Sequence, residues 1–334
     1  MLRFIAFASV ITIAFFVMLP ASARAQEAAK SAAPAPMAAR SVTVELKTPT
    51  GTLHGTLLLP AADAQPVPVV LLHAGSGPTD RDGNSPLLPG ANNSLKMLAE
   101  GLAQNGIATL RFDKRGVAQS VSAATREEDL RFDTYIADTV AWGKWLKADK
   151  RFTKLIIAGH SEGSLIGMVA ARQIPAQGFI SIAGVGRPAQ EVLLAQLRAG
   201  LPAAPLKEAE GIVARLVAGK TVGNVSPDLA VLFRPSVQPY LLSWFRYNSA
   251  KEIAKLRIPV LIVQGTNDVQ IKMDEAQLLS KAKPDAKLVV ISEMNHTLKT
   301  VPMGDNAAQQ RAYTDPTVAV TPELIKAITD FVKK

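Results

Sequence analysis

The pentapeptide Gly159-His-Ser-Glu-Gly163 constrains the fold of this chain more than any other segment. The apolar run 155–158 precedes it and the helix-like run 164–171 follows it. Glycine at both ends predicts a turn so tight that a side chain at either position would collide with its neighbours. A strand, such a turn and a helix raise Ser161 above the edge of a sheet, near the positive end of the helix dipole. The segment therefore predicts a strand–turn–helix unit of an α/β fold, with Ser161 presented at one edge of the sheet.

Strand and helix signals alternate along most of the chain. An antiparallel hairpin is predicted first, over 42–46 and 53–59, with residues 49–51 in its turn. Short apolar runs then predict buried strands over 67–72, 107–112, 155–158, 179–183, 260–263 and 288–291. Helices are expected over 93–105, 132–148, 164–175, 274–283 and 322–334. Such alternation is typical of an α/β fold with a mostly parallel sheet flanked by helices.

The alternation stops between residues 185 and 255. This stretch contains no convincing strand, and helices are predicted over 191–199, 206–218 and 240–255. We therefore expect one α/β domain over 41–334 that carries a helical cap at about 185–255.

The first residues are typical of an export signal. Arg3 is followed by the apolar run 4–19 and then by Ala23-Arg-Ala25, so cleavage is expected after Ala25, or alternatively after Ala23. The apolar run is shorter than the roughly 20 residues that a membrane-spanning helix needs. We therefore predict a signal peptide over 1–25, and after it a disordered Ala/Pro-rich lead-in over 26–40. The protein is thus expected to be periplasmic or secreted, without a stable membrane anchor after signal cleavage.

Composition excludes several kinds of chemistry. The chain has no cysteine, which excludes a cysteine nucleophile, disulfides and thiolate metal sites. Its net charge of +9 is spread without a Lys/Arg block, so no nucleic-acid partner is expected. Dinucleotide and Walker patterns are missing, and the acidic segment 79–83 lacks the ligand spacing of a calcium loop. We expect neither a cofactor nor a metal, and the sequence carries no signal for an oligomeric state.

A serine nucleophile needs a base, and the chain offers four histidines. His54 lies in the early hairpin, His73 ends a strand, and the side chain of His160 should point away from that of Ser161. His296 follows the last core strand, at the carboxyl edge where open α/β sheets bind ligands. His296 is therefore the predicted base, and a surface-loop histidine is the alternative.

The orienting acid should leave a strand at the same edge. Asp268 comes soon after the strand 260–263 and is the predicted partner of His296. A turn-forming role is its alternative. Asp274 is the nearest competitor, but it is expected at the start of the next helix.

Two backbone amides should stabilise the oxyanion. One is the amide of Glu162, directly after the nucleophile, and the other lies in the glycine-rich loop 73–77. Gly75 is the preferred second donor and Ser76 the alternative. After the fourth strand, Asp113 and Arg115 are expected to form internal Asp–Arg pairing that braces loops beneath the site, with substrate binding as the alternative.

Together these motifs resemble the α/β-hydrolase superfamily, most of all bacterial exported serine hydrolases with a Gly-His-Ser-Glu-Gly elbow. Segment 71–83 is similar to their oxyanion loop and segment 113–116 to their loop after the fourth strand. The resemblance spans roughly residues 41–334 and implies an eight-stranded sheet and cofactor-free hydrolysis of carboxylic esters. It implies a triad of Ser161, Asp268 and His296. Ala74 departs from the glycine of some lipases, which leaves the second oxyanion donor open.

Three functions are compatible with these residues. The first is a serine carboxylesterase that acts on a small-molecule ester through an acyl-enzyme, with an apolar pocket in the cap near Trp244, Phe245 and Tyr247. The second is an aminopeptidase or amidase with the same triad, which would need a cap carboxylate such as Glu208 or Glu210 to hold an amine. The third is a non-catalytic binding module that kept the fold.

Overall fold

The computed structural model describes residues 39–61, 66–124 and 126–334. The predicted signal peptide and almost all of the predicted lead-in lie outside these residues, and the first strand begins at Arg40. Within the described ranges, no helix combines the length and apolar character that crossing a bilayer requires.

A mostly parallel sheet organises the described residues from position 39 onward. In this part of the chain it has eight strands in the order β1-β2-β4-β3-β5-β6-β7-β8. β1 pairs antiparallel with β2 and β2 with β4, whereas β4, β3 and the strands from β5 to β8 run parallel. The predicted hairpin and parallel strands are confirmed. The bounds are β1 Arg40–Thr48, β2 Gly51–Leu59, β3 Val67–His73, β4 Ala108–Phe112, β5 Phe152–His160, β6 Gly178–Ile182, β7 Val260–Gly265 and β8 Lys287–Ile291.

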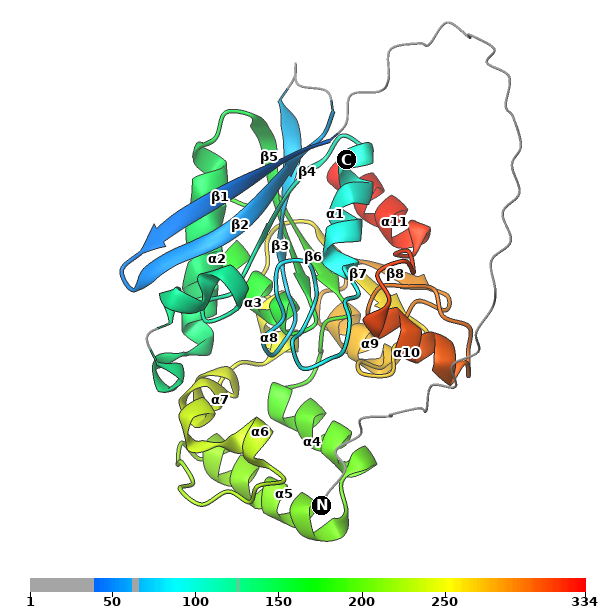
Figure 1. Ribbon diagram of the computed structural model, residues 1–334. Helices are drawn as coiled ribbons and strands as arrows, with labels where there is room; N and C mark the ends of the chain where they lie inside the picture. The colour runs from blue at the N-terminus through cyan, green and yellow to red at the C-terminus, as the bar shows by residue number, and fades with distance from the viewer. Residues whose placement is uncertain (1–38, 62–65, 125) are drawn as a thin grey trace, which may run out of the picture. The chain divides into compact units, whose positions relative to one another are not determined.

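Helices cover both faces of the sheet because the central strands are apolar on both sides (Figure 1). Alternate residues of β3 belong to different cores: Leu71 lies in one, and Val70 and Leu72 lie in the other. The core around Leu71 is closed by α2 (Phe132–Ala148), α3 (Glu162–Ala171) and α9 (Met273–Ala282). The opposite core is closed by α1 (Ser94–Gln104) and α11 (Pro322–Val332).

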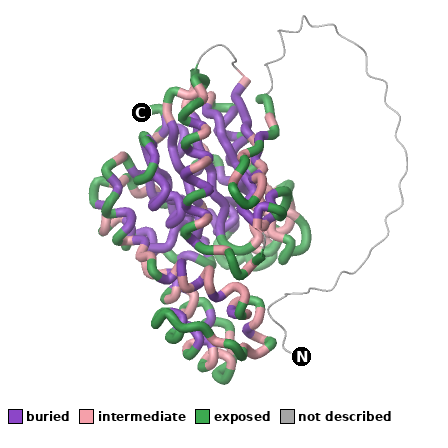
Figure 2. Tube along the Cα trace, turned by 90° about the vertical axis from the view of Figure 1, so that its left-hand side faces the viewer, coloured by how far each residue is buried: buried purple, intermediate pink, exposed green. Residues whose placement is uncertain are grey.

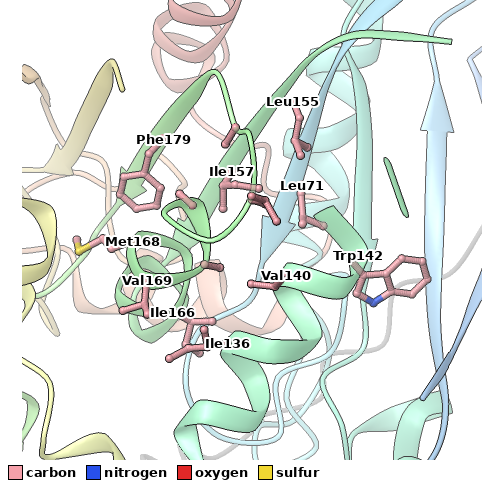
Figure 3. Close-up of a cluster of buried hydrophobic side chains, with 14 of the residues drawn as sticks. Leu71, Ile136, Val140, Trp142, Leu155, Ile157, Ile166, Met168, Val169 and Phe179 are labelled. Atoms are coloured by element: carbon pink, nitrogen blue, oxygen red, sulfur yellow. The ribbon is translucent and has the colours of Figure 1, made fainter. Parts of the chain in front are cut away.

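Among the described residues, the central strands of the sheet are largely buried, as Figure 2 shows. In Figure 3, Leu71, Leu155 and Ile157 from the sheet face side chains of α2 and α3. This packing fixes β5 and α3 relative to each other, and Ser161 lies between them.

The cap begins after β6 (Figure 1). Its helices enclose an apolar core of their own. Its helices are α4 Ala189–Gly200, α5 Ala203–Val217, α6 Ala230–Phe233 and α7 Gln238–Trp244, with a short 3-10 turn, η3, over Pro235–Val237. The single helix predicted over 240–255 is wrong. The chain turns after α7, and the Asn248 side chain accepts the amide of Lys251 to begin α8 (Ser249–Ile253). Ile253 of α8 then joins the core beneath the sheet instead of the cap core.

Two cap elements, α6 and η3, and three elements outside the cap were not predicted from the sequence. α10 (Asn306–Thr314) precedes α11, and two 3-10 turns, η1 (Ala118–Ala123) and η2 (Glu127–Asp129), follow β4. All three are short or largely polar, so they lack the apolar periodicity from which the other elements were predicted.

Candidate active site

Ser161 occupies a strained turn between β5 and α3. Its φ of 55° and ψ of −121° are unusual for a residue with a side chain. Its amide donates to the carbonyl of Ile182, at 2.9 Å. A Cβ on Gly159 would lie 2.0 Å from the carbonyl oxygen of Gly163, and one on Gly163 would lie 2.5 Å from that of His73. Glycine is thus required at both flanking positions, as the pentapeptide predicts.

His296 and Asp268 form a buried pair. Nδ1 of His296 donates to Oδ2 of Asp268 at 2.8 Å, which leaves Nε2 of the neutral ring able to accept a proton. The other oxygen of Asp268 accepts the amides of Gln270 and Ile271, each at 2.8 Å. Burial by itself raises the pKa of Asp268, but the His296 partner and these two amides outweigh it and leave that pKa below its ordinary value.

Backbone contacts hold the loops of Asp268 and His296 together. Thr266 donates to the carbonyl of Ile291 at 3.0 Å, and Asn267 donates to that of Met294 at 3.2 Å. Since β7 and β8 are parallel neighbours, the loops that leave their carboxyl ends meet at one sheet edge.

His160 connects the serine turn to the His296 loop. Its Nε2 donates to the carbonyl of His296 at 2.9 Å, and the two ring centroids are 4.7 Å apart. Burial, together with the neighbouring His296, lowers the pKa of His160 to about 3, so the ring is neutral near pH 7. His160 therefore positions Ser161 and His296 relative to each other, a contact that the sequence analysis missed.

The loop after β3 lies against Ser161. A Cβ on Gly75 would be 3.2 Å from the Cβ of Ser161, and Ser76, Ser161 and Glu162 border the same cavity. Glu162 is the first residue of α3, so its amide is among those that a helix leaves without an internal partner. The residues expected to bind the oxyanion are thus neighbours of the expected nucleophile.

The loop after β4 contains the expected internal Asp–Arg pairing, but as two pairs with partners from other segments. Asp113 accepts from Arg81 at 2.6 Å, and Arg115 donates to Asp138 at 2.6 Å, so each belongs to a separate ion pair. The residue between them, Lys114, is 1% exposed and contacts both the loop after β3 and Glu162. Sequence reasoning missed it, because a lysine flanked by charged residues resembles a solvated surface position.

A cavity of about 590 Å³ lies between the sheet edge and the cap, with Ser161 and Glu162 on its wall. Most of its lining is aliphatic or aromatic, including Val185, Val192, Leu193, Leu241, Trp244 and Ile271. Of the described residues, the carboxylates that line it belong to Glu162 and Glu127, and Glu127 accepts from Arg234 and Ser236. Among the same residues, no cluster of three or more His, Cys, Asp or Glu side chains could hold a metal ion.

The cap acids named as possible amine ligands lie elsewhere. Glu208 accepts the amide of Ser226 at 2.8 Å, and Glu210 pairs with Arg198 at 2.8 Å. Neither borders the cavity. The structure therefore does not bring them to Ser161.

Comparison with known proteins gives matches to hydrolases. Residues 91–242 match a family model described as serine aminopeptidase, S33. Esterase EstD of Thermotoga maritima is 30% identical over 254 residues, which cover 74% of this chain and 58% of that relative. The chain thus spans little more than half the length of the curated relative it matches.

Solved structures resemble the described fold. Est1E of Butyrivibrio proteoclasticus with ferulic acid bound has a TM-score of 0.58 at 19% identity, covering 87% of this chain and 98% of that one. The α/β hydrolase GrgF of Penicillium sp. sh18 has a TM-score of 0.58 at 18% identity, covering 88% and 98%. With the eight-stranded order and the helices on both faces, these likenesses establish that the chain has the α/β-hydrolase fold.

Proposed function

We propose that this protein is an exported serine carboxylesterase that cleaves small-molecule esters through an acyl-enzyme intermediate. One observation carries the proposal: the strained Ser161 turn shares a sheet edge with the buried His296–Asp268 pair. The EstD match adds support, because that relative is named an esterase.

The reaction would begin with attack of Ser161 Oγ on the ester carbonyl carbon while His296 Nε2 takes the hydroxyl proton. The carbonyl electron pair moves to the oxygen, which the amides of Glu162 and of Gly75 or Ser76 would stabilise. When the tetrahedral intermediate collapses, His296 gives its proton to the leaving alcohol. Water, deprotonated by His296, then hydrolyses the acyl-enzyme and restores Ser161. Asp268 stays ionised throughout and stabilises the imidazolium.

The cavity supports esters with an apolar acyl group of small to medium length. Its cap side carries Val192, Leu193 and Leu241, which favour hydrocarbon over charged groups. A preference for charged substrates over short neutral esters would contradict this part of the proposal.

An aminopeptidase or amidase is the second candidate, and the description of the matching family model favours it. Recognition of a substrate amine would need a free carboxylate in the cavity. The cavity carboxylates among the described residues are engaged: Glu127 with Arg234 and Ser236, and Glu162 with Tyr240 and Lys114. We therefore rank the amidase below the esterase.

Export rests on the N-terminal sequence alone. Ala23-Arg-Ala25 after an apolar run supports cleavage after Ala25 and a periplasmic or secreted product. Expression of the full chain in a Gram-negative host, fractionation and N-terminal sequencing test this. A chain in the cytoplasm that keeps residues 1–25 would refute it.

The function is tested with p-nitrophenyl acetate, butyrate and octanoate, and with alanine p-nitroanilide alongside. We expect ester turnover by residues 26–334 and its loss in Ser161→Ala. Turnover that persists in the variant would refute the role of Ser161. Cleavage of the anilide alone would support the amidase. Wild-type protein that a fluorophosphonate does not label would support the binding module.

A further inference from the structure

A buried lysine lies behind the loop expected to bind the oxyanion. Lys114 follows β4 and is 1% exposed. Because the sheet order is β4-β3-β5, the loops after these three strands are neighbours at the carboxyl edge. Lys114 therefore reaches both the loop after β3 and Glu162 after β5. Burying an ammonium group is unfavourable unless polar partners replace its water.

Those partners are all part of the candidate site. The Lys114 Nζ donates to the carbonyl of Gly75 and, at 2.8 Å, to that of Gly77. It also lies 3.6 Å from Oε2 of Glu162 and 5.6 Å from the ring centroid of Tyr135. Tyr240 of α7 donates to the other carboxylate oxygen of Glu162. Lys114 and Glu162 thus compensate each other's charge behind the serine turn.

The contact with Gly75 also sets the direction of a backbone amide. In a trans peptide the C=O and the next N–H point in opposite directions, and the described residues include no cis peptide. Since the Gly75 carbonyl faces Lys114, the Ser76 amide faces away from it. The Ala74 carbonyl accepts from His73 Nδ1 at 2.9 Å, so the Gly75 amide likewise faces away from His73. Two buried side chains therefore orient both candidate donors of this loop.

The charge of Glu162 gives Lys114 a second effect. Glu162 supplies one expected oxyanion donor through its amide, and the carboxylate of the same residue is buried beside it. A carboxylate without a partner would repel the negative oxygen that forms in the transition state, and this repulsion is strong where water is excluded. Burial lowers the pKa of Lys114, and the neighbouring Glu162 opposes that effect. In its ammonium form, Lys114 lies 3.6 Å from Oε2 of Glu162 and offsets the repulsion.

We propose that Lys114 is a positioning residue for the oxyanion hole: it holds the Gly75–Gly77 loop by two carbonyls and neutralises the carboxylate of Glu162. The inference rests on the proposed function, because it assumes that an oxyanion forms at Ser161. A positioning residue of this kind acts on the transition state more than on substrate binding.

The test compares Lys114→Met with the double variant Lys114→Met/Glu162→Gln. In the single variant, kcat for p-nitrophenyl butyrate should fall about 100-fold, with KM changed less than about threefold. Inhibition by butaneboronic acid, which forms a tetrahedral adduct with serine, should weaken by a similar factor. The double variant removes the unpaired charge and should regain about tenfold of that loss but remain below wild type, because the loop carbonyls still lack their donor.

The matched control is Lys283→Met. Lys283 is also buried, and it pairs with Asp285. It lies just after the C-terminal end of α9, whereas Asp268 precedes the N-terminal end of that helix. This control should keep kcat and boronate inhibition within about twofold of wild type. A folded Lys114→Met with wild-type kcat and boronate inhibition would overturn the inference.

The double variant contains neither buried charge of the pair, so no unpaired charge opposes its folding. If Lys114→Met does not fold, the double variant tests the role of Lys114 instead. Wild-type kcat and boronate inhibition in the double variant would overturn the role of Lys114. Wild-type protein without ester turnover would instead refute the proposed function, and direct binding of butaneboronic acid, measured by calorimetry, would still report the oxyanion hole.

Discussion

At the scale of single residues, Asp268 combines burial with a full set of acceptor contacts. Its side chain is 1% exposed, yet His296 and the amides of Gln270 and Ile271 occupy its oxygens. These contacts keep the carboxylate ionised and hold the proton of His296 on Nδ1. Nε2 is thereby left as the basic nitrogen.

The substitution Asp268→Asn tests this arrangement. We expect kcat for p-nitrophenyl butyrate to fall about 10⁴-fold, because an amide no longer fixes the tautomer or stabilises the imidazolium. The control is Asp274→Asn, since Asp274 is 60% exposed on the first turn of α9. Full activity of Asp268→Asn together with loss in Asp274→Asn would show that Asp268 is not the partner of the base.

At the scale of elements, one ion pair joins the cap to the turn η2 after β4. The carboxylate of Glu127 in η2 accepts from Arg234 Nε at 2.8 Å and from Ser236 of η3 at 2.5 Å. The hydrogen bond from Arg234 lowers the pKa of Glu127 below its ordinary value of 4.5, and burial offsets part of that effect. The lowered pKa means that the contact is complete above pH 4.5 and is lost as the pH falls through the folded-state value. The cap is therefore tied to this turn at neutral pH.

Replacing Glu127 with Gln should loosen that connection. Hydrogen exchange should accelerate over residues 230–237, while exchange in α2 stays unchanged. Because Glu127 and Arg234 border the cavity, KM for p-nitrophenyl octanoate should rise about twofold to fivefold, as expected for a partly exposed ion pair. The control is Glu128→Gln, whose carboxylate pairs with Arg126 in the same segment. Equal exchange in both variants would contradict the assignment.

At the scale of the whole molecule, two buried histidines make stability depend on pH. Burial lowers the pKa of His73 and of His160 to about 3, from an ordinary value of 6.5. The unfolded chain binds protons at these rings as the pH falls below 6.5, whereas the folded protein does not until about pH 3. Their contribution to the free energy of unfolding is thus complete above pH 6.5 and is lost as the pH falls from there toward 3.

The variant His160→Gln separates one of these contributions. Between pH 6.5 and 5, each buried neutral histidine costs up to about 1.4 kcal/mol of unfolding free energy per pH unit. The unfolding free energy of the variant should therefore fall less steeply with falling pH than that of wild type. The difference in slope corresponds to the uptake of about one proton fewer on unfolding. Urea unfolding at half-unit pH steps, followed by circular dichroism and tryptophan fluorescence, measures both slopes. Identical slopes would mean that His160 is protonated in the folded state.

The sequence by itself determined the sheet, the serine turn and the residues of the expected triad. Apolar runs and glycine positions are local signals, and they predicted the hairpin, the parallel strands and the need for glycine beside Ser161. Asp268 and His296 could be named because each follows a strand closely, and parallel strands bring such loops to one edge. The break between α7 and α8 was missed, since the helical pattern continues across it.

Only the tertiary structure decided the roles of Lys114 and His160. The sequence around Lys114 is typical of a charged surface loop. Its burial depends on contacts with Gly75, Gly77 and Glu162, which lie after β3 and β5. The ring of His160 contacts His296 because the chain reverses at Ser161 and the loop after β8 lies beside that turn. A buried charge or ring is stabilised by partners that are remote in sequence, so local periodicity carries no signal for it.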